Sequence, residues 1–197
     1  MNPLKTIWLE TRETIEERIE AGSRSQTILL IALFGISWMI GQAYLKDSGN
    51  DIPVFRIVVY ALIVGPFVGA FFWFVISGLT YLTGRMFGGD ASWRDLRTAV
   101  AWATIPYSAT LLLWIPRILL FGQELFSEHT PHMDSSLLLL LLATVFEVVD
   151  LVMTVWFFIV LSKSIGTAHR ISAWKGFFAF IIPFFPFIFL LVLLSLL

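Results

Sequence analysis

Five long blocks of apolar residues, separated by short polar segments, organise most of this sequence. The blocks cover about residues 27–45, 54–83, 96–120, 136–161 and 176–197. A helix rises about 1.5 Å per residue, so roughly 20 apolar residues suffice to cross the roughly 30 Å hydrocarbon core of a bilayer. Within lipid every backbone polar group must be satisfied, which favours helices for such blocks. We therefore expect an all-α integral membrane protein with five transmembrane helices.

The residues before the first block follow the pattern of an amphipathic helix over about residues 3–22. Apolar residues recur there every three or four positions, and five glutamates occupy the other side. Such a helix can lie in the membrane interface, although its acidic face argues against simple attraction to anionic lipid. Packing against the neighbouring loops is the alternative. We expect a leader over residues 1–26, followed by a membrane domain over residues 27–197.

The composition supports the membrane class and narrows the chemistry. Of the 197 residues, 58% are hydrophobic, whereas soluble domains have about 45–50%. A net charge of −1 excludes nucleic-acid binding as the main function. The chain has no cysteine, which excludes disulfides and thiol catalysis. His129 and His132 flank Pro131, which breaks helical spacing between them, so we expect neither a metal site nor a cofactor.

The polar stretch Gly84–Arg97, between the second and third blocks, has the features of an ordered turn. Gly88 and Gly89 permit a positive φ, so the preceding helix can end there. Ser92 and Asp95 have the spacing of a capping box, which predicts that the next helix begins at this point. The stretch is either a well-capped hairpin between two spans or a docking surface for a soluble partner or lipid headgroups.

A short motif runs through this stretch and the helix that follows it, and its residues are Gly88, Gly89, Trp93, Arg94 and Pro106. This motif resembles the core motif of the Yip family (Ypt-interacting proteins). The resemblance extends over most of the chain, and the opening residues are similar to those of bacterial members. It implies a five-span membrane domain with a cytoplasmic N-terminus. Eukaryotic relatives bind small Ypt/Rab GTPases, partners that a bacterial-type member would lack.

A stripe of small residues in the second block predicts the closest contact between helices. Ala61, Gly65 and Gly69 recur every four residues, so they share one face of a helix. Small side chains let two helix backbones approach closely within a membrane. The seam can join two helices of one chain or two copies in a homo-oligomer. Pro66 lies beside it and is expected to kink the helix.

Three polar residues lie near the middle of the fourth block and share a helix face: Glu147, Asp150 and Thr154. Ionisable groups at this depth are costly and face a helix bundle or water. One hypothesis is a proton or cation site in a buried cavity. The other is a hydrogen-bond clamp between helices, because no basic partner is expected at matching depth and Arg117 is expected at the far membrane boundary. The expected clamp partners are Tyr60, Ser77, Tyr107 and Ser108.

The distribution of basic residues predicts the orientation in the cell membrane. Of the 13 Lys and Arg residues, ten lie in the leader, the second loop and the fourth loop, and three lie near the opposite ends of the blocks. Basic residues favour the cytoplasmic side. We therefore expect a cytoplasmic N-terminus and an extracytoplasmic C-terminus. His169 falls in the fourth loop and is expected to be solvated.

Two functional hypotheses follow, and neither is an enzyme. No His-Glu-x-x-His segment occurs, and no nucleophile, base and oxyanion donor can be assembled from the sequence. The first hypothesis, implied by the family resemblance, is a membrane organiser or adaptor that meets a protein partner at the leader and at Gly84–Arg97. The second is a small proton- or cation-linked transporter or channel that uses Glu147 and Asp150.

Overall fold

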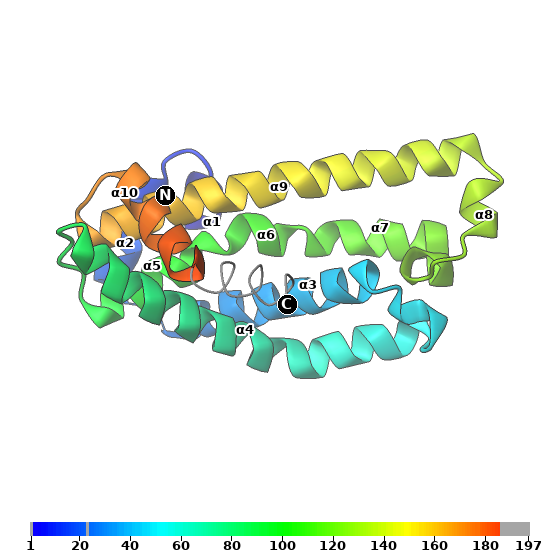
Figure 1. Cartoon of the computed structure of the whole chain (residues 1–197), viewed down its shortest axis with the longest axis horizontal. Helices are drawn as coiled ribbons and strands as arrows, with labels where there is room; N and C mark the ends of the chain where they lie inside the picture. Colours follow the sequence, from blue (N-terminus) through cyan, green and yellow to red (C-terminus); the bar gives the residue numbers. More distant parts are fainter. Residues whose placement is uncertain (1, 23, 186–197) are drawn as a thin grey trace, which may run out of the picture. The chain divides into compact units, whose positions relative to one another are not determined.

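The computed structural model describes residues 2–22 and 24–185, and the regular structure of these residues is entirely helical (Figure 1). These residues include three short 3-10 helices: η1 (Ser48–Asn50), η2 (Gly122–Phe126) and η3 (Ile182–Phe184). The α-helices are α1 (Pro3–Thr6), α2 (Thr11–Ala21), α3 (Arg24–Leu45), α4 (Val54–Met86), α5 (Trp93–Ala103), α6 (Ile105–Ala109), α7 (Leu111–Phe121), α8 (Pro131–Asp134), α9 (Leu137–His169) and α10 (Ala173–Ile181).

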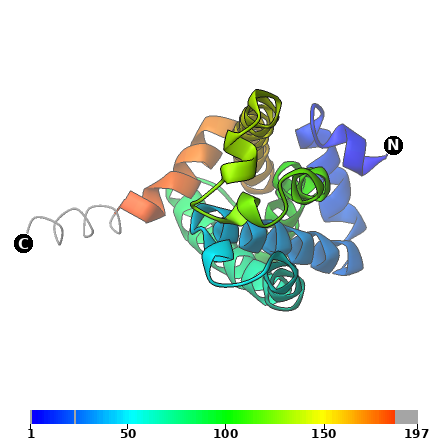
Figure 2. The ribbon, with the colours of Figure 1, turned by 90° about the vertical axis from the view of Figure 1, so that its right-hand side faces the viewer.

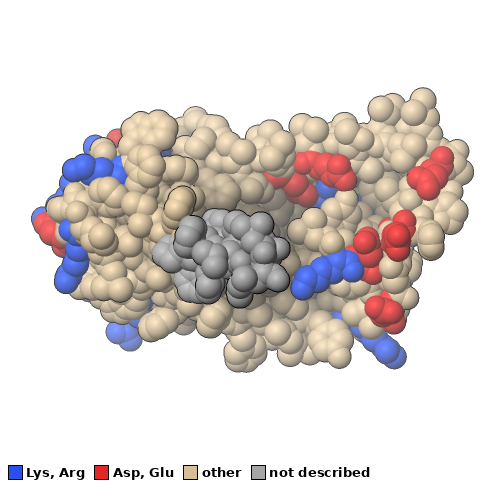
Figure 3. All heavy atoms as spheres, in the orientation of Figure 1, with Lys and Arg blue, Asp and Glu red and all other residues tan. Residues whose placement is uncertain are grey.

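Four helical segments among the described residues are long and apolar enough to cross a membrane. They are Arg24–Leu45, Val54–Met86, Trp93–Phe126 and Leu137–His169. Many large apolar side chains on these segments are exposed, and Figure 3 shows wide areas of the visible face without charge, as a lipid-facing surface requires. The prediction of a multi-pass helical membrane protein is therefore confirmed. Most of the predicted fifth span, residues 186–197, lies outside the described residues.

Two of these helices are longer than a bilayer is thick. Helices α4 and α9 each have 33 residues, which corresponds to a length of about 50 Å. The hydrocarbon core measures only about 30 Å, so each helix tilts or extends beyond it. Helix α9 continues to His169, well past the expected end of the fourth span at residue 161.

The chain divides into two compact units, each built from segments that are distant in the sequence. Unit 1 contains Met1–Thr27, Phe72–Thr104 and Phe157–Leu197. Unit 2 contains Ile28–Phe71 and Ile105–Trp156. Three of the boundaries fall inside helices α3, α4 and α9. The leader, the loop before α5 and the loop before α10 all belong to unit 1.

In unit 1 the leader is packed on helix α5. The side chains of Ile7, Thr11 and Ile15 are buried, and the guanidinium of Arg18 in α2 lies 5.5 Å from the ring centroid of Trp102 in α5. The expected single helix over residues 3–22 is instead two helices, α1 and α2, separated by a turn. Helix α2 ends at Gly22, whose φ of 62° gives the left-handed C-cap that glycine favours.

Unit 2 is held together by a close contact between α3 and α4, which lie side by side in Figures 1 and 2. A Cβ atom added at Gly65 would lie 2.7 Å from the Cα of Ile36. One added at Gly69 would clash with the carbonyl oxygen of Ile31. The two glycines therefore let the backbones approach to a distance that any side chain would prevent.

An aromatic core lies beside this contact in unit 2. The rings of Trp114 and Phe126 stack at a centroid distance of 5.9 Å, and Ala61 is buried in the same cluster at 1% exposure. Offset stacking of this kind adds to the stabilisation that burial alone provides. The remaining buried members are Ile40, Ile57, Phe121 and Leu125.

The third span is interrupted twice, at Thr104 between α5 and α6 and at Thr110 between α6 and α7. Each threonine donates its hydroxyl to the carbonyl three residues earlier, at 2.7 Å. Pro106 has no amide hydrogen to donate to the preceding turn, which accounts for the first interruption. The predicted break near Pro106 is confirmed, whereas α7 continues through Pro116.

Candidate functional site

The motif loop of unit 1 is a tight connection between α4 and α5. Helix α4 ends at Met86, and Gly88 adopts a φ of 84°. The amide of Gly89 donates to the carbonyl of Gly84 at 3.0 Å. The hydroxyl of Ser92 accepts from the amide of Asp95 at 3.1 Å and caps α5. The sequence prediction of a glycine turn followed by a capped helix is confirmed.

His169 holds this loop in place, although the sequence indicated a solvated residue. Its side chain is only 1% exposed. Its Nε2 lies 3.1 Å from the carbonyl oxygen of Thr80, and its Nδ1 accepts from the amide of Ala91 at 3.4 Å. The expectation was wrong because α9 extends beyond its predicted end and carries the imidazole against α4. A buried ring with both nitrogens engaged acts as a structural clamp.

The glycines of the loop make room for this imidazole. A Cβ atom at Gly84 would lie 2.6 Å from the Cδ2 of His169, and one at Gly89 would lie 2.7 Å from its Cγ. A Cβ atom at Gly88 would meet none of the described residues within 4 Å, and this glycine is required instead by its positive φ. The three glycines of the turn therefore serve two different purposes, close approach and backbone conformation.

Two further motif residues place aromatic and basic groups at the start of α5. The ring of Trp93 makes edge contacts with Phe74 and Tyr81, each at a centroid distance of 5.6 Å. Arg94 is exposed, and its guanidinium lies against Gly22 at the end of the leader. The structure thus brings four motif residues together with the leader in unit 1. Pro106 lies in α6 and belongs to unit 2.

Unit 2 contains a polar cavity of about 460 Å³ between α3, the helices of the third span and α9. Glu147, Asp150 and Thr154, which the sequence placed on one helix face, all line it. Hydroxyl groups line the opposite side, where Ser37 and Thr110 are hydrogen-bonded to each other at 2.8 Å. The cavity therefore brings carboxylates and hydroxyl groups together inside segments that are otherwise apolar.

Asp150, one of the acids that line the cavity, forms an ion pair with Arg117. This pair is contrary to the expectation that the acids have no basic partner. Arg117 is 2% exposed and forms a salt bridge with Asp150, whose side chain is 31% exposed. The Arg117 guanidinium also lies 4.9 Å from the centroid of Trp114 and 5.2 Å from that of Phe146. The expectation of no basic partner for the acids was wrong, because α7 turns the Arg117 side chain inward to a carboxylate and aromatic rings.

The partner of Glu147 also differs from the expected set. The hydroxyl of Tyr44 in α3 donates to Oε1 of Glu147 at 2.7 Å. Of the four expected clamp partners, Tyr107 lines the same cavity. The hydroxyls of Ser77 and Ser108 have no hydrogen-bond partner among the described residues. Tyr44 was missed because it lies at the end of the first block, where polar residues are common.

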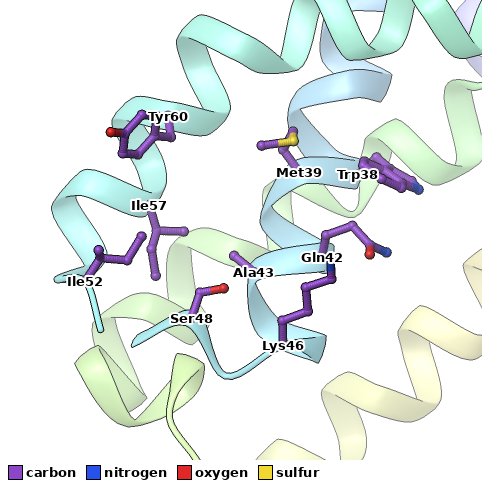
Figure 4. A pocket seen from close by; sticks show the side chains of 9 residues that line it. All are labelled: Trp38, Met39, Gln42, Ala43, Lys46, Ser48, Ile52, Ile57 and Tyr60. Atoms are coloured by element: carbon purple, nitrogen blue, oxygen red, sulfur yellow. The ribbon is translucent and has the colours of Figure 1, made fainter. Parts of the chain in front are cut away.

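A second, smaller cavity of about 280 Å³ lies between the end of α3, η1 and the start of α4 (Figure 4). Lys46 and Gln42 point along one wall, and Tyr60 lies on the α4 side. The rest of the lining is largely apolar. Tyr60 therefore faces a different space from the one that contains Glu147 and Asp150.

These features define a multi-pass helical membrane protein with a glycine-rich loop clamped by a histidine and a polar cavity among its spanning segments. The Yip1 domain matches the chain over residues 7–196, and the chain belongs to this family. The resemblance inferred from the motif residues is thus confirmed. No curated protein and no solved structure matches the chain.

Proposed function

We propose that the protein is a non-enzymatic membrane organiser or adaptor that binds a protein partner through unit 1. Proteins of the Yip family are generally non-enzymatic. The observation that carries the proposal is the packing of the leader on α5, the helix that begins in the family motif. Because of this contact, the two segments expected to meet a partner present one continuous surface rather than two separate ones.

The contact between leader and motif helix is well buried. Ile7, Ile15, Leu96 and Ala99 are all 0% exposed. Burying each large aliphatic side chain contributes about 1.5–3 kcal/mol. The outward face of α2 carries exposed charged residues that a partner can contact: Arg12, Glu13, Glu16 and Glu20.

We place this surface in the cytoplasm. The leader, the Gly84–Arg97 loop and the fourth loop contain ten basic residues, and all three belong to unit 1. Arg117 no longer counts for the opposite side, because it is buried against Asp150. Two basic residues, Lys46 and Arg56, then remain for the extracytoplasmic side, which strengthens the bias expected of cytoplasmic loops.

The test separates the leader from α5 by one substitution. Ile15→Glu introduces a charge at a fully buried position, whereas the control Leu9→Glu introduces the same charge at a position that is 77% exposed. Limited proteolysis should show faster cleavage in the leader of Ile15→Glu only. Crosslinking in membranes should then recover the partner from wild type and Leu9→Glu but not from Ile15→Glu. Equal recovery from an undocked leader would contradict the proposal.

Transport is a second candidate, favoured by the polar cavity of unit 2. Since Asp150 is held by Arg117, Glu147 is the carboxylate that would bind and release a proton or cation. Flux into liposomes should occur with wild type and fall at least tenfold with Glu147→Gln. No flux, or equal flux, rules this function out.

A homo-oligomer would have to use a surface other than Gly65 and Gly69, which contact α3.

A further inference from the structure

We propose that the polar cavity of unit 2 binds a small amphiphile with a primary ammonium group, whose charge lies between Glu147 and Asp150 and whose hydrocarbon part lies along the apolar wall. This cavity of about 460 Å³ combines the carboxylates of Glu147 and Asp150 with the hydroxyl groups of Ser37, Thr110 and Thr154. The binding would hold whether the protein acts as an adaptor or as a transporter.

The charged side chains around the cavity are not balanced, because two carboxylates face one guanidinium. Arg117 is paired with Asp150, and its guanidinium is enclosed by aromatic rings. Glu147 accepts a hydrogen bond from Tyr44 but forms no ion pair within the part of the chain that the structure describes. The group of three therefore has one excess negative charge when all are ionised. Within a spanning segment such a charge is costly, and a bound cation would compensate it.

The hydrogen bonds favour an ammonium group that still carries hydrogens. Oδ1 of Asp150 is buried and has no hydrogen-bond partner among the described residues. Burying such an acceptor without a hydrogen-bond donor costs about 1–3 kcal/mol of lost hydration. A primary ammonium has three donors, enough for Asp150, Glu147 and the nearby hydroxyl of Thr154. A quaternary ammonium has the charge but no donor.

The size of the cavity favours an organic ligand over a bare ion. Its volume of about 460 Å³ lies within the roughly 300–1,000 Å³ typical of small-molecule sites. A bare cation would leave most of this space unfilled. Leu45, Leu151 and Trp114 contribute apolar surface to the lining, against which a short hydrocarbon chain can pack. These three observations together select an amphiphilic amine.

Calorimetric titration of the full chain in phosphatidylcholine nanodiscs tests the inference. The probes are hexylammonium, hexyltrimethylammonium and 1-hexanol, which share a hydrocarbon chain and differ in charge and hydrogen-bond donors. We expect saturable one-site binding of hexylammonium, at least tenfold weaker binding of the trimethyl compound, and unsaturable partitioning of hexanol. Glu147→Gln should weaken hexylammonium binding at least tenfold, whereas Glu128→Gln, at an exposed loop position, should leave it unchanged.

A second variant keeps the test decisive if Glu147→Gln does not fold. Gly41 lines the cavity, and among the described residues a Cβ atom added there would meet only the hydroxyl of Tyr107, at 3.6 Å. Gly41→Leu should fold and fill part of the cavity, so saturable binding should disappear. The proposal is overturned if Gly41→Leu and wild type give the same hexylammonium isotherm, or if the trimethyl compound binds as tightly as hexylammonium.

Discussion

Arg117 links three helices through one side chain, and its removal should expose how much unit 2 depends on it. Arg117→Met leaves the carboxylate of Asp150 without its cation. Removing one partner of a buried pair costs about 3–5 kcal/mol, and the partial exposure of Asp150 places the expected loss near the lower value. The free energy of unfolding in detergent, measured by thermal or denaturant titration, checks this expectation.

Two variants control for the loss of a positive charge. Arg56→Met makes the same change at an exposed position with no ion pair among the described residues, and should cost less than about 0.5 kcal/mol. The pair Arg117→Met/Asp150→Leu replaces both charges by apolar groups and should regain most of the lost stability. A double variant no more stable than Arg117→Met would contradict the importance of the ion pair.

At the residue scale the sequence was enough to predict that the acids share a helix face, but not which residues they contact. A spacing of three or four residues along a helix was enough to place Glu147, Asp150 and Thr154 on one face. Arg117 lies on another helix, and which way it points depends on how α7 packs after the interruptions at Thr104 and Thr110. Periodicity within one block carries no information on that rotation.

At the scale of elements, the α3–α4 contact predicts an unequal response to the same substitution within α4. Gly65→Ala would force a Cβ atom to within 2.7 Å of the Ile36 backbone, so the helices must separate. We expect a loss of about 2–3 kcal/mol, typical of overpacking between rigid elements. Gly78→Ala is the control, since within the described part of the chain its Cβ atom would meet only a side-chain atom of Trp93, at 4.0 Å, and alanine is the better helix former.

The same measurement decides the outcome for both glycines. Thermal unfolding in one detergent should place Gly65→Ala below wild type and Gly78→Ala at or above it. Equal midpoints would mean that the small residue at Gly65 is not needed for close packing. The sequence identified the stripe because small residues at four-residue spacing form a continuous face, but it did not reveal which helix fills that face.

The clamp between His169 and the motif loop predicts coupled effects of two substitutions. Gly84→Ala should destabilise unit 1, because the new methyl group meets the imidazole ring. In a His169→Ala background the ring is absent, so the same substitution should cost far less. We expect a coupling energy of about 1–2 kcal/mol in a double-mutant cycle of unfolding free energies. Additive costs would show that the ring does not require the glycine.

The sequence was enough to predict the helices and their caps, but not the clamp between His169 and the motif loop. Ser92 and Gly88 act through neighbours a few residues away, and such local chemistry is readable from spacing. His169 acts on Thr80 and Ala91, which are far from it in the chain. Its burial follows from the length of α9, and helix ends inside apolar blocks have no polar signal to mark them.

At the scale of the whole molecule, the basic residues predict which side each terminus faces. Fusing a reporter that is active only in the cytoplasm to either end should give activity at the N-terminus and none at the C-terminus. The expectation follows from five spans and from the excess of basic residues in the leader and in the second and fourth loops. Activity at both ends would show an even number of spans.

The membrane class and the approximate spans could be read from the sequence because they depend on block length and hydrophobicity alone. The division into two units could not. Unit 1 gathers Met1–Thr27, Phe72–Thr104 and Phe157–Leu197, and contacts across such separations leave no periodic pattern. The sequence also did not predict the turn that divides the leader into α1 and α2. A hydrogen bond of 2.8 Å between the hydroxyls of Thr14 and Thr6 bridges this turn.

The contact between Arg18 and Trp102 has a consequence for how the chain is made. Trp102 follows Arg18 by more than 80 residues, and translation at roughly 5–20 residues per second separates their emergence by several seconds. During that interval the leader has already emerged from the ribosome, but helix α5, on which it packs, has not. An amphipathic helix in that condition can rest on the membrane surface first and move to α5 only after the second span has been inserted.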